Sequence, residues 1–175
     1  MKACWFDAFG AAHDVLQQGD WPTPEPGAGE VLVQLHTTGV NPSDVKKRAG
    51  GFPDLLAAGP VIPHSDGAGV ITAVGEGVSP SRVDERVFVY QAQYGRQLGT
   101  AAETVALDST RAPVLPDAAS FEVGACIGIP IMTAHRCVFA DGPVAGQLIL
   151  VTGGAGRVGH YAIQWANRAG ARVIA

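Results

Sequence analysis

The sequence lacks the features that mark several large classes of protein. Its three cysteines, Cys4, Cys126 and Cys137, show no C-x-x-C spacing, so we expect free thiols and no disulfide framework. Lysine and arginine form no basic block and the net charge is −4, which disfavours binding to nucleic acid. No uninterrupted apolar run reaches the length of a membrane span, and no apolar signal region follows Met1. These absences predict a cytoplasmic protein that does not enter a membrane.

Apolar residues and glycine are abundant. Of the 175 residues, 47% are hydrophobic and 16% are charged, a balance typical of a packed globular chain. The length fits one domain by default and allows two. The 23 glycines suit a chain with many turns and a phosphate-binding loop.

The most informative segment is the last thirty residues. An apolar run at 148–151 ends in a glycine-rich turn, an amphipathic segment follows, and a second apolar run occupies 172–175. This order predicts a strand, a loop, a helix and a second strand. The glycines fit the pattern G-x-G-x-x-G at Gly154, Gly156 and Gly159, which in this context indicates a dinucleotide site.

Each glycine of the loop has a physical role in such a site. The first permits the tight turn, the second lets the backbone approach a diphosphate, and the third lets the helix pack closely on the strand. The amides at the start of the helix then face the phosphates. We expect cofactor contacts from Gly153, Gly154, Ala155, Gly156, Arg157, Val158 and Gly159. The alternative is a glycine-rich connection with no ligand.

The N-terminal part is predicted to be rich in β-structure. Val31, Val33 and Leu35 alternate with polar residues, the pattern of a half-buried strand. Strands are expected over 2–9, 30–36, 69–74, 86–90 and 100–107, and helices over 43–50, from Ser120, and over 130–140. Short strands separated by proline and glycine turns suggest a small barrel or sandwich. Gly67, Gly69, Gly75 and Gly77 are interpreted as bulge and turn glycines of that barrel.

Several segments together resemble a known superfamily. They are Gly39–Asp44, Ile62–Val70, Gly99–Glu103, Met132–His135 and Val151–Gly159. In this order they resemble the medium-chain dehydrogenases/reductases, and most closely the zinc-independent quinone oxidoreductases of the zeta-crystallin-like group. The resemblance runs over essentially the whole chain.

The resemblance implies an α/β protein with a β-rich N-terminal part. A GroES-like β-barrel domain is expected over 1–122, followed over 123–175 by the start of a Rossmann dinucleotide-binding domain, which is incomplete here. The resemblance also implies a homodimer. Because a doubly wound nucleotide domain needs further strands, we expect this sequence to be a fragment of a longer enzyme.

The resemblance also addresses metal binding. The zinc-ligand positions of zinc-dependent relatives match Asn41, Ser65 and, approximately, Ile129, with Asp66 at the acidic position. Amide, hydroxyl and alkyl side chains do not build a site of thiolate and imidazole ligands. His64 beside Asp66 lacks a third converging ligand. We therefore expect no metal and treat His64 as structural or pocket-lining.

Candidate catalytic residues follow from the same alignment of motifs. The resemblance implies that Asn41 lies near the nicotinamide and substrate and that Thr133 helps to place the nicotinamide ring. A carboxamide and a hydroxyl suit orientation, because both donate and accept hydrogen bonds without charge. Asp44 ends the Asn-Pro-x-Asp motif, and both a pocket role and a favourable charge in the first turn of a helix are open for it. No general acid is assigned.

A substrate pocket is expected around Lys46, His64 and Tyr94. Lys46 stands where quinone reductases often have tyrosine, which puts quinone specificity in doubt. The lysine either favours an acidic or carbonyl-bearing substrate or faces solvent. Tyr94 either lines a slot for a planar substrate or packs as an ordinary aromatic residue.

The leading hypothesis is an NAD(P)H-dependent, zinc-independent oxidoreductase that transfers hydride to a quinone or an α,β-unsaturated carbonyl. NADPH is the expected cofactor and NAD is not excluded, because the residue that reads the ribose 2′ position would follow the second strand. One alternative is another medium-chain reductase, either an alcohol dehydrogenase or an enoyl reductase. A second is a truncated, non-catalytic nucleotide-binding module.

Overall fold

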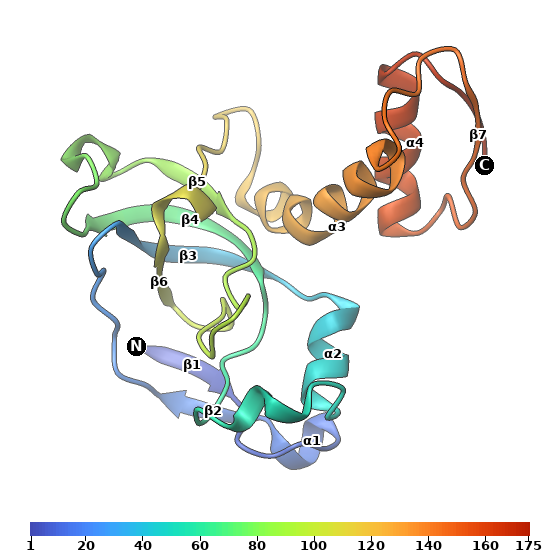
Figure 1. The fold of residues 1–175 in the computed structure, drawn as a ribbon. Coiled ribbons are helices and arrows are strands. Elements are labelled where there is room, and N and C mark those ends of the chain that lie inside the picture. The colour runs from blue at the N-terminus through green and yellow to red at the C-terminus, as the bar shows by residue number, and fades with distance from the viewer. The chain divides into compact units, whose positions relative to one another are not determined.

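The structure, a computed structural model, describes residues 1–175 and divides them into two compact units, 1–128 and 129–175 (Figure 1). The first unit contains β1 (Lys2–Trp5), α1 (Ala12–Val15), β2 (Gln17–Asp20), β3 (Glu30–Gly39), α2 (Pro42–Arg48), β4 (Asp66–Val74), β5 (Arg86–Val89) and β6 (Thr104–Asp108). Helix α3 (Phe121–Phe139) contains the boundary between the units. The second unit continues with β7 (Leu148–Leu150), α4 (Arg157–Arg168) and β8 (Arg172–Ile174).

The first unit is built on a four-stranded antiparallel sheet in the order β5-β4-β3-β6. The alternation predicted for β3 is confirmed, because Val31 and Val33 are fully buried and pair with Leu107 and Val105 of β6. Strands β1 and β2 form a separate antiparallel pair, and an isolated bridge joins Ala3 to Ala102. The predicted β-rich N-terminal part is confirmed.

Glycine is required where β3 and β4 change register. The pairing shifts between Leu35 and Thr37, beside Gly69 of β4. A Cβ on Gly69 would collide with the carbonyl oxygen of Gln34, so only glycine allows the strands to approach this closely. The interpretation of Gly69 as a bulge glycine is therefore confirmed. Beyond the shift, the end of β3 pairs with the start of β4, where Gly39 faces Asp66.

Helix α3 runs without interruption where two helices were predicted. Pro130 lies inside the helix, so the expectation of a new helix starting there was wrong. A proline removes one backbone donor and costs about 3 kcal/mol, but it does not end a helix whose flanking residues favour continuation. The first half of α3 lies close to the sheet through small residues. A Cβ on Gly124 would lie 2.7 Å from the Cβ of Ala68.

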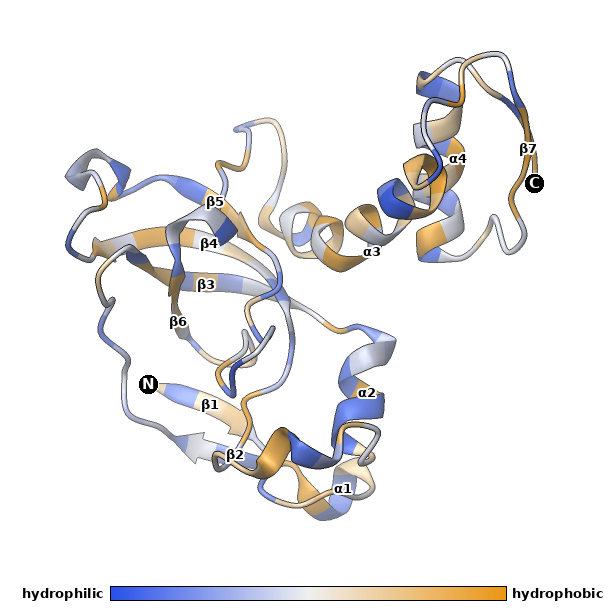
Figure 2. Ribbon diagram, viewed as in Figure 1, coloured by the Kyte–Doolittle hydropathy of each residue, from blue (hydrophilic) through white to orange (hydrophobic).

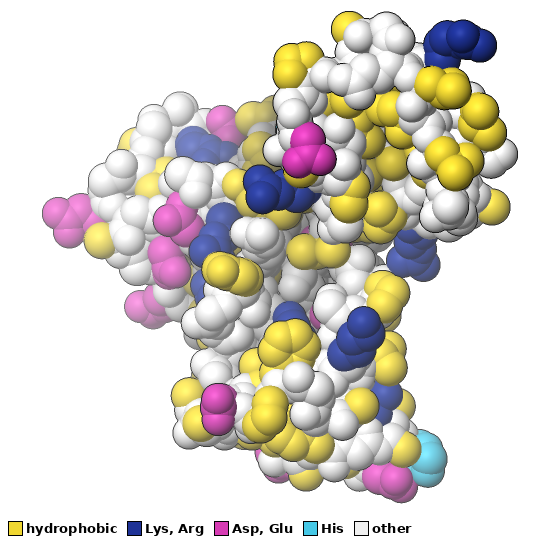
Figure 3. All heavy atoms as spheres, turned by 45° about the vertical axis from the view of Figure 1, so that its right-hand side comes forward, with side chains coloured by type: hydrophobic (Ala, Val, Ile, Leu, Met, Phe, Trp, Pro, Cys, Tyr) yellow, Lys and Arg dark blue, Asp and Glu magenta, His cyan; other side chains and the backbone are white.

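The second unit confirms the predicted strand–loop–helix–strand order. Strands β7 and β8 pair in parallel, with Leu150 opposite Ile174, and α4 connects them. The buried apolar residues of this unit are Ala134, Val144, Ala162 and Ala166. Figure 2 shows β7 as strongly hydrophobic, and Leu150 is 69% exposed. Apolar side chains gather on the surface of this unit (Figure 3).

No helix in the structure combines the length and the apolar character that are needed to cross a membrane.

The close approach at Gly69 generates a stability prediction. We expect Gly69→Ala to lower the free energy of unfolding by more than about 2 kcal/mol, because the added methyl group must displace the backbone of β3. In the control Gly27→Ala, the nearest atom, Glu30 Oε2, lies 3.4 Å from the added Cβ, so a change within about 0.5 kcal/mol is expected. Urea denaturation followed by tryptophan fluorescence measures both. Equal losses in the two variants would contradict the assignment.

Candidate functional site

A group of polar side chains gathers where β3 ends, α2 begins and β4 begins. We call it the polar cluster; its members are Thr38, Asn41, Asp44, Lys47, His64, Asp66, Gln93 and Thr100. Asn41, Asp44, Asp66, Gln93 and Thr100 are each less than a tenth exposed. Buried polar groups carry a free-energy cost unless they are hydrogen-bonded, so their partners define what this cluster can do.

Asn41 is the central residue of the polar cluster. Its Nδ2 donates a hydrogen bond to Asp66 Oδ2 at 2.9 Å, and its backbone N–H donates to Asp44 Oδ2 at 2.8 Å. Asn41 precedes α2, and Pro42 starts the helix, an arrangement that favours a helix N-terminus. Asp44 thus stabilises the start of the helix, while its Oδ1 is buried without a hydrogen-bond partner.

Helix α3 lies directly over the Asp66 carboxylate. A Cβ on Gly128 would collide with Asp66 Oδ1, so glycine is required at this point of the helix. A Cβ on Gly39 would likewise collide with the carbonyl oxygen of Ala125. The carboxylate is therefore covered by backbone, and Asp66 is only 1% exposed.

The hydroxyls of the polar cluster fix the protonation of His64. Thr100 Oγ1 donates to the carbonyl oxygen of Asp66 at 2.6 Å, which uses its only proton. Thr38 Oγ1 lies 2.8 Å from Thr100 Oγ1 and 3.3 Å from the same carbonyl, and must donate to one of them. Thr38 then accepts from His64 Nδ1 at 3.0 Å. Neutral His64 therefore carries its proton on Nδ1 and has an acceptor at Nε2.

Two properties of His64 set it apart from an ordinary surface histidine. Burial lowers the pKa of its imidazole below the ordinary value of 6.5, and the Asp44 charge offsets only part of this effect. The neutral ring is the form that results near neutral pH. The backbone of His64 is left-handed, with φ 75°, a conformation that non-glycine residues adopt at a cost.

Lys47, one residue after the predicted Lys46, is the cation of the polar cluster. Its Nζ donates to Gln93 Oε1 at 2.8 Å, and the charges of Asp44 and Asp66 act on it. Burial lowers the pKa of Lys47, and both carboxylates oppose that shift. Lys46 is exposed, in line with the solvent-facing alternative considered for it.

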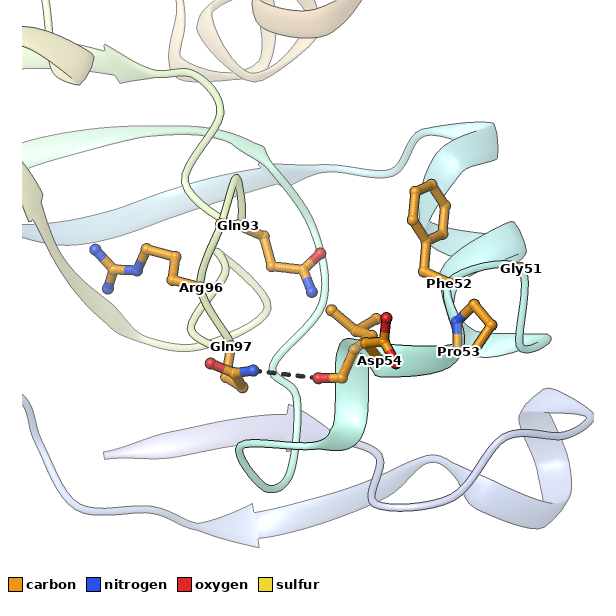
Figure 4. Close-up of a pocket in the computed structure, with 9 residues that line it drawn as sticks. Gly51, Phe52, Pro53, Asp54, Gln93, Arg96 and Gln97 are labelled. Carbon is orange, nitrogen blue, oxygen red and sulfur yellow. Dashed lines mark hydrogen bonds between the residues drawn. The ribbon is translucent and has the colours of Figure 1, made fainter.

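Gln93 also lines a cavity of about 400 Å³ within the first unit (Figure 4). The cavity lies between residues 51–55, which include most of the 3₁₀ helix Pro53–Leu56, and residues 93–97. Figure 4 shows the Gln93 carboxamide directed toward the segment that carries Pro53 and Asp54. Tyr94 is 68% exposed and lies under the Arg111 guanidinium, 5.9 Å from the ring centre.

The glycine-rich loop of the second unit has the space that an anion needs. Gly153 has φ 69°, and a Cβ there would meet no atom within 4 Å. A Cβ on Gly159 would collide with the Gly153 carbonyl oxygen, so this glycine permits the tight turn onto the helix. Gly156 precedes α4, and no side chain caps that helix. These features fit a diphosphate held by backbone amides.

Three predicted cofactor contacts differ in the availability of their side chains. Thr133 Oγ1 donates to the Ile129 carbonyl oxygen at 2.7 Å, so its hydroxyl proton is used within α3 and its lone pairs accept. Arg157 is the first residue of α4 and is exposed, as is Val158.

The structure contains no group of three His, Cys, Asp or Glu side chains placed to hold a metal ion.

Sequence reasoning missed Thr38, Lys47, Gln93 and Thr100. For Lys47 a signal existed, because residues three apart share a helix face and Asp44 is buried on that face. For Gln93 no local signal exists, since its partner lies 46 residues away.

Known proteins resemble this chain along nearly its whole length. The alcohol dehydrogenase GroES-like domain family matches residues 27–171. Quinone oxidoreductase of Rattus norvegicus is 36% identical over 175 residues, which cover 99% of this chain and 52% of the relative. The synaptic vesicle membrane protein VAT-1 homolog of Homo sapiens is 35% identical over 158 residues, which cover 89% of this chain and 39% of the relative.

Solved structures of other proteins also resemble this chain over nearly its whole length. The quinone oxidoreductase from Coxiella burnetii matches with a TM-score of 0.89 at 31% identity, covering 99% of this chain and 55% of that one. A mycobacterial protein complexed with NADPH matches with a TM-score of 0.83 at 32% identity, covering 99% and 52%. The chain spans about half the length of the curated relatives it matches.

The lowered pKa of His64 predicts a pH dependence of stability. The folded state favours the neutral ring, so its contribution is fully present above pH 6.5 and is lost as pH falls toward the folded pKa. We expect the unfolding free energy of the wild type to fall relative to His64→Asn below pH 6.5, by at most about 1.4 kcal/mol per pH unit. Asparagine tolerates the left-handed backbone and keeps a donor for Thr38. Parallel curves from pH 8 to 5 would contradict the prediction.

The metal prediction has a direct test. Because Asn41, Ser65 and Ile129 stand at the zinc-ligand positions, we expect elemental analysis of the purified protein to find no stoichiometric zinc. One zinc per chain after dialysis would overturn this prediction.

Proposed function

The chain belongs to the alcohol dehydrogenase GroES-like domain family of the medium-chain dehydrogenases/reductases, and we propose that it acts in the NADPH-dependent reduction of a quinone or an α,β-unsaturated carbonyl. The observation that carries the proposal is the open glycine loop at the uncapped start of α4. The NADPH complex of a 32% identical protein supports the choice of cofactor. In this proposal residues 1–122 form the catalytic domain and residues 123–175 begin the cofactor domain.

The loop's contribution is to hold the diphosphate of the cofactor. The proposed contacts are Gly153, Gly154, Ala155, Gly156, Arg157, Val158 and Gly159, of which Gly153 has open space around it and Gly156 already donates its N–H to the Gly153 carbonyl oxygen at 2.9 Å. The start of α4 adds the positive end of the helix dipole, which favours an anion. The bound nicotinamide supplies the hydride of the reaction. Thr133 is proposed to contact the cofactor as an acceptor, because its proton is used within its helix.

The polar cluster is proposed to orient the reacting groups. Asn41 donates one N–H to Asp66, so the remaining amide N–H and the carbonyl oxygen point in fixed directions. Asp44 keeps Asn41 at the helix start through the backbone bond. Neither a carboxamide nor a hydroxyl transfers a proton near neutral pH, so the proton that completes the reduction comes from solvent.

The pocket residues predicted from the sequence have separate roles in this proposal. His64 offers a neutral acceptor at Nε2, which suits a donor group on a ligand. Lys46 and Tyr94 are exposed and are proposed to contact substrate at the edge of the site. We also propose that the protein is a cytoplasmic homodimer and that it works without zinc, as the family resemblance implies.

A substrate panel separates this function from its alternatives. NADPH consumption is measured with quinones, enones and enoyl thioesters, and NADP reduction with alcohols. Turnover of quinones or enones alone supports the proposal, whereas preference for thioesters or alcohols supports an enoyl reductase or an alcohol dehydrogenase. NADPH binding without any turnover would support the non-catalytic module and contradict the proposed activity.

The loop assignment predicts the effect of a side chain at Gly156. We expect Gly156→Val to raise the dissociation constant for NADPH at least about tenfold, because the side chain occupies space that the diphosphate needs. The backbone of Gly156 has φ −77°, which valine can adopt, and the added Cβ would lie 3.2 Å from the Gly153 carbonyl oxygen. Fluorescence titration measures the affinity, with Ala140→Val at an exposed site of the same unit as control. Equal affinities in wild type and Gly156→Val would contradict the assignment.

A further inference from the structure

The carboxamide of Gln93 is buried, and only its oxygen has a hydrogen-bond partner. The residue is 3% exposed, and its Nε2 has no hydrogen-bond partner. A buried donor left without an acceptor costs about 1–3 kcal/mol. Because Gln93 lines the cavity between segments 51–55 and 93–97, a ligand in that cavity can supply the missing acceptor (Figure 4).

Lys47 determines which end of the carboxamide faces the cavity. The oxygen and nitrogen of a glutamine side chain exchange places when the group turns over, so the neighbours must fix the orientation. An ammonium group only donates hydrogen bonds. Lys47 Nζ donates to Gln93 Oε1 at 2.8 Å, so the amide oxygen must face Lys47. The other end of the carboxamide is then the NH2 group, which can only donate hydrogen bonds.

The charge of Lys47 strengthens this arrangement. Burial lowers the pKa of Lys47, and the charges of Asp44 and Asp66 offset part of that shift. The hydrogen bond of 2.8 Å that the ammonium form donates to Gln93 Oε1 is charge-assisted. A charged donor at the oxygen also polarises the amide, which makes the NH2 group a stronger donor.

The walls of the cavity indicate a neutral ligand with apolar parts. Phe52, half exposed, and Leu55 provide apolar surface. Arg96 does not serve an anion, because its Nη2 donates to the Ala106 carbonyl at 2.7 Å and its Nη1 lies 3.8 Å from Glu30 Oε1. Figure 4 shows the Arg96 side chain pointing away from Gln93. Asp54 at the wall disfavours a negative charge.

We propose that Gln93 is a specificity-determining residue whose Nε2–H donates a hydrogen bond to the carbonyl oxygen of a neutral, ring-bearing ligand, with Lys47 as the positioning residue. The inference rests on the proposed function, since it names the part of the acceptor that the first unit recognises. The cavity volume of about 400 Å³ lies in the range of small-molecule sites.

A matched pair of probes tests the inference without cofactor. 1-Tetralone and tetralin share a carbon skeleton and differ in one carbonyl oxygen, and neither reacts with thiols. Titration calorimetry or ligand-observed NMR gives a dissociation constant for each probe. We expect the wild type to prefer 1-tetralone, and Gln93→Met to reduce that preference about three- to tenfold, the effect of one neutral hydrogen bond.

The positioning role of Lys47 has its own variants. Lys47→Met is expected to reduce the preference for 1-tetralone although Gln93 is intact, and Lys47→Arg, also a pure donor, is expected to restore it. Lys2→Met is the matched control at an exposed lysine of β1, outside the polar cluster, and should leave the preference unchanged. Circular dichroism checks the fold of each variant. If Gln93→Met does not fold, the preferences of Lys47→Met and Lys47→Arg for 1-tetralone decide whether the inference holds.

Clear outcomes overturn the inference. A wild type that binds both probes equally, or a preference unchanged in Gln93→Met and Lys47→Met, contradicts it. Because these measurements need no NADPH, they are independent of the turnover assays. Selective binding of 1-tetralone without turnover supports the role of Gln93 and contradicts the proposed reaction. Turnover of quinones or enones without selective binding of 1-tetralone supports the proposed reaction and contradicts the role of Gln93.

Discussion

The hydrogen bond from the Asn41 carboxamide to the Asp66 carboxylate is the contact on which the site depends. It joins the start of α2 to the start of β4, and both side chains are buried. Asp44 fixes the same asparagine through its backbone, and Gly128 of α3 closes over the carboxylate. A buried carboxylate needs such partners, because an unpaired one carries a large desolvation cost. Burial lowers the pKa of Lys47, and the charges of Asp44 and Asp66 offset part of that shift.

Features that depend on neighbours in the sequence were predictable. The alternation of Val31 and Val33, the bulge at Gly69 and the strand–loop–helix–strand order around Gly156 are all local patterns. Their physical causes, side-chain alternation and the missing Cβ of glycine, are visible in the residues themselves. The uninterrupted course of α3 through Pro130 was not predictable, because a proline both starts and kinks helices.

Features that depend on packing between distant segments were not predictable. Lys47 meets Gln93 across 46 residues, and Thr38 meets Thr100 across 62. Asn41 and Asp44 were recognised through their motif, but Asp66, the hydrogen-bond partner of the Asn41 carboxamide, was considered only as a metal-ligand position. The chemistry of the two units also differs. The first offers side-chain dipoles with fixed directions, and the second offers backbone amides at a helix start.

The small core of the second unit has a consequence for how it would respond to an anion. Three alanines and one valine supply its buried apolar side chains, and strands β7 and β8 pair over only three residues each. Closure of the glycine loop depends on the pairing of β7 with β8, and the exchange of their amide protons with deuterium reports how often that pairing opens. A diphosphate that binds only the closed form would slow this exchange, and its apparent affinity would be reduced by the fraction of time the unit spends open.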